Sequence, residues 1–86
     1  MGGPPMTLNV LFFAQAREGA GCSSTALDVP AGSRVRDALD ALVARHPGLA
    51  PLRGHVALSL NGVLARGDEA LVDGAELAVL PPVSGG

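Results

Sequence analysis

Residues 33–47 read SRVRDALDALVARHP, and this stretch predicts a single amphipathic helix. From about Arg34 to Arg45, apolar side chains recur at the spacing of one helical face. They are Val35, Ala38, Leu39, Leu42 and Val43. Ser33 is a favourable N-cap residue, and Pro47 prevents the helix from continuing. We therefore expect one helix that buries one face against the other elements of the fold.

Alternating apolar residues before the helix predict two β-strands. Residues 8–14 are apolar on both faces, which is typical of a central strand. Residues 25–29 alternate between apolar and other side chains and predict a second strand that pairs with the first. The polar segment between them, residues 15–21, ends in glycines, and we expect a loop or a single helical turn there.

The segment after the helix predicts a hairpin and a last strand. Residues 47–51 contain two prolines and predict a loop, and residues 56–60 alternate cleanly as a strand. Asn61-Gly62 is the strongest short turn signal in the chain, and residues 63–64 begin the return strand. Residues 76–80 form a final strand that is apolar on both faces and leads directly into prolines.

The order strand, strand, helix, strand, short strand, strand indicates an α+β fold with one main helix across a mixed sheet of about five strands. The commonest arrangement of this kind at this length is the ubiquitin-like β-grasp, in which the first and last strands lie side by side in the middle. Successive strand residues face opposite sides, so Leu11 and Phe13 point away from the helix if Val10 and Phe12 lie under it. We expect Leu11 and Phe13 to form an exposed apolar patch that a partner protein covers.

Length and composition favour one domain. We expect a disordered lead-in at residues 1–6, a β-grasp domain at residues 7–80 and a flexible tail at residues 81–86. The net charge of −2 gives no electrostatic footprint for nucleic acid or for an acidic membrane. There is no run of eighteen apolar residues and no signal-peptide pattern, so we expect the cytoplasm.

The reactive side chains inside the domain form no recognisable active site. Cys22 is a single cysteine, which excludes an internal disulfide, and it is better interpreted as a passive loop thiol than as a nucleophile. His46, His55 and Cys22 stand at scattered positions and do not make a zinc site, which needs about four ligands at paired spacings, and no cofactor motif is present. All six basic residues are arginine, so the sequence has no side-chain amine for linkage to a second copy. By elimination, the chemistry would lie at the C-terminal end.

The sequence ends in a diglycine that follows two prolines: Pro81-Pro82-Val83-Ser84-Gly85-Gly86. Glycine has no Cβ, so Gly85 and Gly86 can pass through a channel too narrow for other residues. The prolines hold the chain extended, and six residues at about 3.3 Å each reach roughly 20 Å beyond the domain. We expect these six residues to enter a partner's active site, with the Gly86 carboxylate as the reacting group. The alternative is an inert, frayed terminus.

Residues 10–18, VLFFAQARE, resemble the opening strand and turn of the small subunit of molybdopterin synthase, the MoaD family. Residues 80–86, LPPVSGG, resemble the tail of that family, and residues 60–62, LNG, match its central turn. The resemblance spans roughly residues 7–86. Leu80 departs from it, because members of the family often carry Phe at this position.

The resemblance implies a sulfur carrier for molybdenum cofactor biosynthesis. An ATP-dependent activating enzyme of the MoeB type would adenylate Gly86, which would then be converted to a thiocarboxylate. The sulfur would pass to cyclic pyranopterin monophosphate in the large subunit of the synthase, the MoaE type. The chain would therefore be a non-catalytic sulfur-donor subunit with no cofactor of its own, active only with the large subunit.

Three alternatives remain open at this point. A ubiquitin-like protein modifier would use Gly86 to form isopeptide bonds with lysines of other proteins. Sulfur carriers of thiamine and cysteine biosynthesis share the diglycine and the β-grasp, although the thiamine carriers lack the opening motif. A plain interaction module with an inert tail is the last alternative.

Overall fold

In the computed structural model, which describes residues 3–81, the first and last strands lie side by side in the middle of one sheet. The five strands are β1 (Met6–Phe12), β2 (Ser24–Val29), β3 (Ala57–Leu60), β4 (Val63–Ala65) and β5 (Glu76–Leu80). Their order across the sheet is β2-β1-β5-β3-β4. β1 and β5 are parallel, and the remaining neighbours are antiparallel, so the sheet is mixed as predicted.

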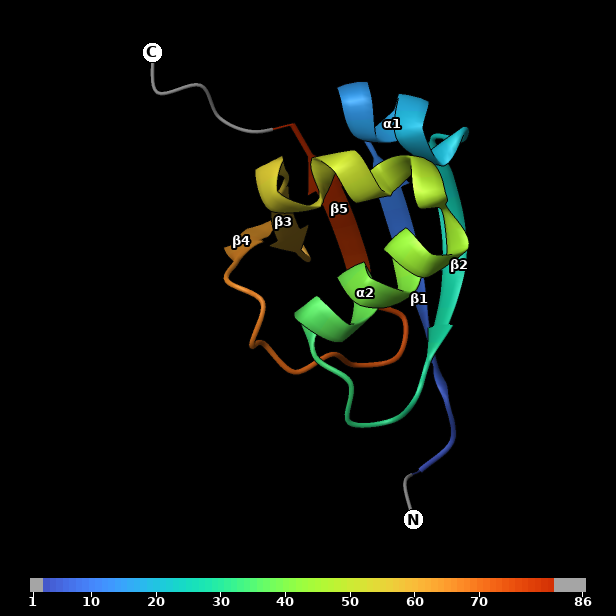
Figure 1. The fold of residues 1–86 in the computed structure, drawn as a ribbon. Helices are drawn as coiled ribbons and strands as arrows, with labels where there is room; N and C mark the ends of the chain where they lie inside the picture. Colours follow the sequence, from blue (N-terminus) through green and yellow to red (C-terminus); the bar gives the residue numbers. More distant parts are fainter. Residues whose placement is uncertain (1–2, 82–86) are drawn as a thin grey trace.

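Helical segments cover one face and one end of this sheet (Figure 1). α2 (Val35–Arg45) and the 3-10 helix η1 (Pro47–His55) lie across one face, whereas the short helix α1 (Ala14–Ala20) lies at the end where β5 finishes. Among residues 3–81, no helix lies on the other face of the sheet. The predicted α+β class and β-grasp arrangement are confirmed.

The core lies between α2 and the inner face of the two central strands. Val35, Ala38 and Leu42 of α2 are fully buried, as the helical periodicity predicts. They pack in one cluster with inward-facing residues of β1 and β5, which include Leu8, Val10, Phe12, Leu77 and Val79. Burial of each such leucine, valine or phenylalanine side chain contributes about 1.5–3 kcal/mol relative to exposure. Phe12 is the one aromatic residue of this core within residues 3–81.

The hairpin between β3 and β4 turns at the predicted dipeptide. Leu60 pairs with Val63, so Asn61 and Gly62 form a two-residue loop. Both have positive φ, 51° for Asn61 and 86° for Gly62, as a type I′ turn requires. This turn fixes which residues of β4 face each side of the sheet.

The beginning of the chain differs from the expectation in three respects. Met6, which we assigned to the lead-in, is the first residue of β1 and is only 8% exposed. The strand ends at Phe12 rather than at residue 14, because Ala14 has φ 50° and turns the chain out of the sheet. The polar segment that follows is helix α1, which ends at Gly21 in the left-handed conformation.

Two further expectations around α2 were wrong. The N-cap is Arg34 rather than Ser33, and the Asp37 carboxylate accepts a hydrogen bond of 2.8 Å from the Arg34 N–H. Ser33 is instead buried, and its carbonyl accepts from the Leu71 N–H at 3.1 Å. The proline-containing loop after α2 is η1, which is ordered because Leu49 enters the core.

Within residues 3–81, no helix is both long and apolar enough to cross a membrane.

Candidate functional site

β5 positions the root of the C-terminal tail at one end of the sheet. Leu80 pairs with Ala57 of β3, and the Val79 carbonyl accepts a 3.1 Å hydrogen bond from the Phe13 N–H. The chain is therefore held on both sides until it reaches Pro81, which is half-buried. The remaining predicted site residues lie outside the described part of the chain; they are Pro82, Val83, Ser84, Gly85 and Gly86.

The sheet register brings apolar side chains together on the face opposite α2. Leu11 pairs with Ala78, which pairs with Ser59, which pairs with Leu64. Paired residues point to the same side of a sheet, and this row alternates with the buried row that contains Phe12 and Val79. Leu80 and Ala57 form the next row on the same face, beside Phe13.

We define the outer apolar patch by the apolar members of these two rows, which are Leu11, Phe13, Ala57, Leu64, Ala78 and Leu80. Phe13 is 44% exposed and Leu64 is 69% exposed, while Ala78 is buried at the centre of the patch. At the other end of the same face stand polar residues, including Thr7, Asn9 and Glu76. The patch thus adjoins the tail root. Leu11 is half-buried and Phe13 is exposed on the face opposite α2, and their coverage by a partner stays a prediction.

Phe13 is exposed because the backbone turns immediately after it. It is the N-cap of α1, with extended angles of φ −121° and ψ 148°, and its carbonyl accepts from the Ala16 N–H at 3.0 Å. The side chain therefore keeps the outward direction of a strand residue while the chain leaves the sheet. Alternation along the sequence was sufficient to predict this position.

α1 is fixed beside the tail root by a close approach of two backbones. A Cβ at Gly19 would lie 2.7 Å from the Gly48 carbonyl oxygen, and a Cβ at Gly48 would collide with the Gly19 carbonyl. Neither position can accept a side chain without moving α1 away from η1. α1 therefore packs against both η1 and the end of β5 (Figure 1).

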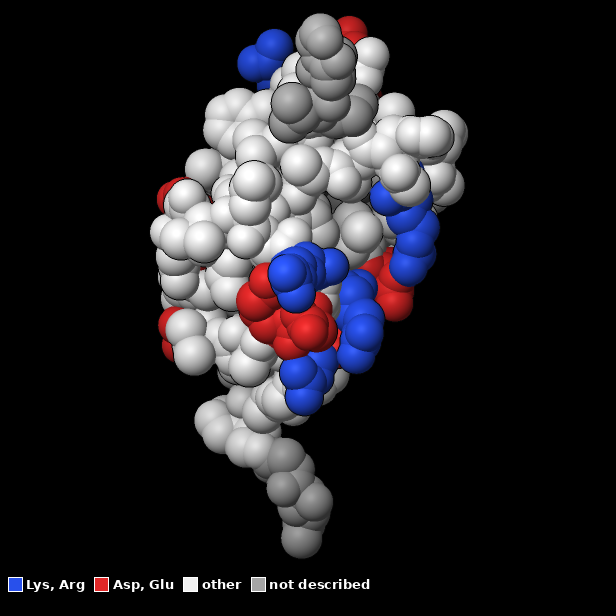
Figure 2. Space-filling model, turned by 90° about the vertical axis from the view of Figure 1, so that its left-hand side faces the viewer, with Lys and Arg blue, Asp and Glu red and all other residues white. Residues whose placement is uncertain are grey.

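Charged side chains are concentrated away from the tail root on the face that carries β4. Figure 2 shows most of the arginine and acidic side chains of this face grouped in its lower half, with a few charged side chains at its upper edge. In the loop after β4, the Glu69 carboxylate accepts hydrogen bonds from the N–H groups of Arg66 and Gly67, at 2.7 and 2.8 Å. These backbone donors hold the pKa of Glu69 below its ordinary value. The carboxylate thus orders its own loop and faces no catalytic partner.

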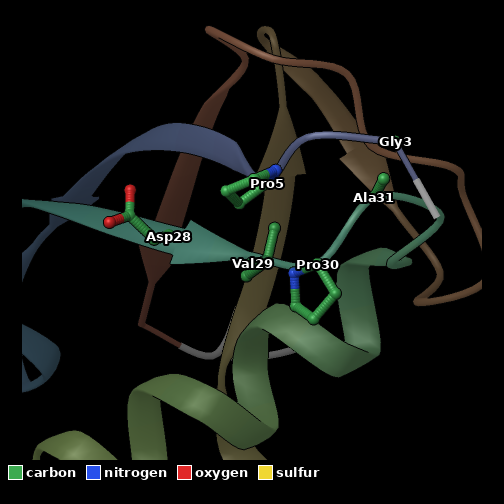
Figure 3. Close-up of a pocket in the computed structure, with 6 residues that line it drawn as sticks. All are labelled: Gly3, Pro5, Asp28, Val29, Pro30 and Ala31. Carbon is green, nitrogen blue, oxygen red and sulfur yellow. The ribbon is translucent and has the colours of Figure 1, made fainter. Parts of the chain in front are cut away.

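A surface cavity of about 560 Å³ lies where the chain enters β1 and leaves β2 (Figure 3). It is lined by Gly3, Pro5, Asp28, Val29, Pro30 and Ala31. Asp28 is the one ionisable residue in this lining, and its carboxylate already accepts a 2.7 Å hydrogen bond from the Thr7 hydroxyl. A binding site normally combines apolar walls with several convergent polar groups, which this lining lacks.

The scattered Cys and His side chains have structural surroundings. His46 packs edge-on against Phe12, with ring centroids 5.7 Å apart, and its Nε2 is buried without a hydrogen-bond partner. Cys22 is half-buried against the core. Residues 3–81 contain no group of three or more metal-ligating side chains. The described part of the candidate site is therefore an apolar surface patch beside the end of β5.

Comparison with known proteins extends over nearly the whole chain. A model of the ThiS family matches residues 10–86. The molybdopterin synthase sulfur carrier subunit of Chlamydomonas reinhardtii is 37% identical over 83 residues, which are 94% of this chain and 100% of that protein. The family match thus includes β5, which leads to the tail root, and the residues that follow it in the sequence.

Two solved structures share the fold and the sequence pattern. The crystal structure of small archaeal modifier protein 1 from H. volcanii has a TM-score of 0.83 and 37% identity, covering 91% of this chain and 99% of that one. A chain in the complex of subunits 1 and 2 of molybdopterin-converting factor from Helicobacter pylori has a TM-score of 0.69 and 27% identity, covering 94% of this chain and 100% of that one. The similar proteins therefore include a sulfur carrier, a protein modifier and a subunit seen in complex.

Proposed function

Because this chain belongs to the ThiS family, we propose that it is the sulfur-carrier small subunit of a molybdopterin synthase, with the sulfur carried on the C-terminal carboxyl of Gly86. One observation carries this proposal: β5, the last strand before the diglycine in the sequence, ends directly beside the outer apolar patch. The near full-length similarity to a molybdopterin synthase sulfur carrier subunit supports the choice of pathway.

The proposed chemistry begins with activation of a poor electrophile. A carboxylate oxygen of Gly86 attacks the α-phosphorus of ATP, pyrophosphate leaves, and an acyl adenylate forms on a separate activating enzyme. A sulfur nucleophile then attacks the acyl carbon and AMP leaves with one of the former carboxylate oxygens. Cleavage of the bond between this sulfur and its donor, with two electrons supplied by a thiol reductant, leaves the thiocarboxylate. ATP is consumed by the partner, and no cofactor resides on this chain.

The thiocarboxylate then acts as a tethered nucleophile. Its sulfur is anionic at neutral pH, as a thiolate of low pKa is. The acceptor would be cyclic pyranopterin monophosphate bound in the large subunit, and two carriers in succession would supply the two dithiolene sulfurs. Tethering replaces a bimolecular encounter by an oriented one, which can lower a barrier by several kcal/mol.

The outer apolar patch is the proposed docking surface for the large subunit. A partner that covers Leu11, Phe13 and Leu64 would remove apolar surface from water beside the point where the tail leaves the domain. The similarity to a chain in the H. pylori complex of two subunits supports such a partner. Acid–base groups for the pterin chemistry would belong to that partner, so this chain alone would not turn over substrate. We place the reaction in the cytoplasm, where ATP is available to the activating enzyme.

A second function is favoured by the similarity to small archaeal modifier protein 1. The same adenylated Gly86 would form an isopeptide bond with a lysine of another protein instead of accepting sulfur. The other sulfur-carrier pathways, of thiamine and cysteine biosynthesis, would use the same activated end with a different acceptor. These alternatives share the first chemical step and differ in the nucleophile that follows.

Intact-mass measurement tests the proposal directly. The chain is incubated with a MoeB-type activating enzyme, ATP, a sulfur donor and a thiol reductant, and its mass should rise by the difference between sulfur and oxygen. Deletion of Gly86 should abolish this increase and the formation of molybdopterin with the large subunit. A variant without Gly85 and Gly86 that supported molybdopterin synthesis at the normal rate would overturn the proposal.

A further inference from the structure

Arginine supplies every basic side chain of this protein, and several of these side chains are committed to polar contacts. Arg34 donates to the Asp68 carbonyl at 2.7 Å, Arg45 donates to the Ala26 carbonyl at 2.8 Å, and Arg53 forms an ion pair with Asp40. Arg17 and Arg36 are exposed on α1 and α2. The surface therefore carries its positive charge on guanidinium groups alone.

Guanidinium and ammonium groups differ in their reactivity toward an activated acyl group. A guanidinium stays protonated at any physiological pH, so it has no free electron pair on nitrogen with which to attack a carbonyl carbon. A lysine amine loses its proton far more readily and is an established nucleophile toward acyl groups. An acyl adenylate at a chain end is thus exposed to attack by lysines within reach, including those of its own chain.

We propose that the absence of lysine leaves the activated Gly86 acyl group to react with an external acceptor, because no side-chain amine of the sequence competes for it. This inference rests on the proposed adenylation of Gly86. The reaction that is avoided is fully balanced: a neutral amine would attack the acyl carbon, AMP would leave, a proton would pass to solvent, and an amide would close the chain on itself.

The geometry identifies where such a competing amine would matter most. Five residues follow Pro81, and an extended segment of that length spans at most about 17 Å. α1, which carries Arg17, lies beside the end of β5 (Figure 1). The first turn of α2, which carries Arg36, lies at the other end of the sheet, where the loop before β5 hydrogen-bonds to Thr7.

The other nucleophiles of the chain are weaker competitors. Cys22 is half-buried and packed against the core, which limits its access to a reactive chain end. Serine and threonine hydroxyls are poor nucleophiles without an adjacent base. An α-amino group before the described segment would compete little, because residues 3–5 lie at the end of the domain opposite the end of β5 (Figure 1).

Two matched lysine variants test the inference. The wild-type chain, Arg17→Lys and Arg36→Lys are each incubated with the activating enzyme and ATP but without a sulfur donor. Arg17→Lys should accumulate a species lighter by one water, at least about tenfold more than Arg36→Lys, because the tethered reaction depends on reach. Peptide mapping should locate the new amide between residue 17 and Gly86. The wild-type chain should form no such species.

A parallel incubation with the sulfur donor separates failure of this inference from failure of the proposed function. If no chain releases pyrophosphate or gains sulfur, the proposed function is wrong, and this inference is wrong with it. If all three chains gain sulfur but Arg17→Lys forms no internal amide, the inference alone is overturned. It is also overturned if the wild-type chain closes on its α-amino group or Cys22 as fast as Arg17→Lys closes on its lysine.

Discussion

Phe13 is the residue on which the proposed docking surface depends most directly. Its ring stands at the rim of the outer apolar patch, 44% exposed, while its backbone N–H is tied to the Val79 carbonyl. Phe13→Ser should weaken binding of a MoaE-type large subunit by about 1–3 kcal/mol, as loss of an aromatic interface anchor typically does. Isothermal titration calorimetry would measure this change.

A matched control separates docking from general loss of apolar surface. Val72 is 61% exposed and lies in the loop that contacts Thr7, at the far end of the sheet from Pro81. Val72→Ser should leave the affinity for the large subunit unchanged. Equal losses for the two variants would mean that the outer apolar patch is not the docking surface.

Glu69 gives the domain a pH-dependent contribution to stability. The N–H groups of Arg66 and Gly67 hold the pKa of Glu69 below its ordinary value of 4.5 in the folded state. The unfolded chain therefore binds more protons between these two values, so stability rises with pH there. The contribution is fully present above pH 4.5 and is lost as the pH falls through the folded-state pKa.

Glu69→Gln should flatten the acid side of the stability profile. Urea unfolding between about pH 3 and 6 would show a smaller decline for this variant than for the wild-type chain. Glu18→Gln, at an exposed position of α1, serves as the control and should keep the wild-type decline. An unchanged slope in Glu69→Gln would contradict the role assigned to this carboxylate.

The residues that the sequence predicted correctly are those whose position follows from local geometry. Asn61 and Gly62 form the predicted turn because their own backbone angles suit it. Leu11 and Phe13 face outward because strand residues alternate. Ser33 was predicted wrongly because its surroundings depend on a residue that is distant in sequence: its carbonyl accepts a hydrogen bond from the Leu71 N–H. At the start of the helix, the Asp37 carboxylate accepts from the Arg34 N–H instead.

At the scale of elements, the position of α1 beside the tail root depends on its contact with η1. Gly48→Ala places a methyl group against the Gly19 backbone, so the two elements must separate. Overpacking of this kind costs about 1–3 kcal/mol. Gly54→Ala is the matched control in the same 3-10 helix, since a Cβ there meets no atom within 4 Å. Urea unfolding should destabilise the first variant clearly and the second little or not at all.

The same contact explains which elements the sequence did not predict. Residues 14–20 are polar and contribute one fully buried side chain, Ala16, so their helical periodicity is weak. η1 contains Pro51, which is typical of a loop. Both segments are ordered by packing on each other and on the core, which a single sequence does not reveal. The strong periodicity of α2 and β5, by contrast, made their type and nearly all their bounds predictable.

At the scale of the whole molecule, the described core stops before the residues that are proposed to react. Within residues 3–81, the buried core extends from Met6 to Val79, and the β-sheet ends at Leu80. Leu64 could not be assigned to the outer apolar patch from sequence, because its face depends on the register of three strand pairs. The role of Gly86 stays a prediction, since residues 82–86 lie outside the described part of the chain.

Variants of the diglycine should therefore change sulfur transfer without changing stability. Extension of the chain by one residue past Gly86 converts its carboxylate to an amide, so the activating enzyme should no longer adenylate that residue. Gly85→Leu keeps the carboxylate but adds a side chain to a segment proposed to pass through a narrow channel. The free energy of unfolding of both variants should lie within about 0.5 kcal/mol of the wild-type value, as is usual for changes outside the core.

Pyrophosphate release and intact mass would measure activation, and urea unfolding would measure stability. Normal transfer by Gly85→Leu would refute the channel argument, and a large loss of stability in either variant would show that the tail belongs to the folded core.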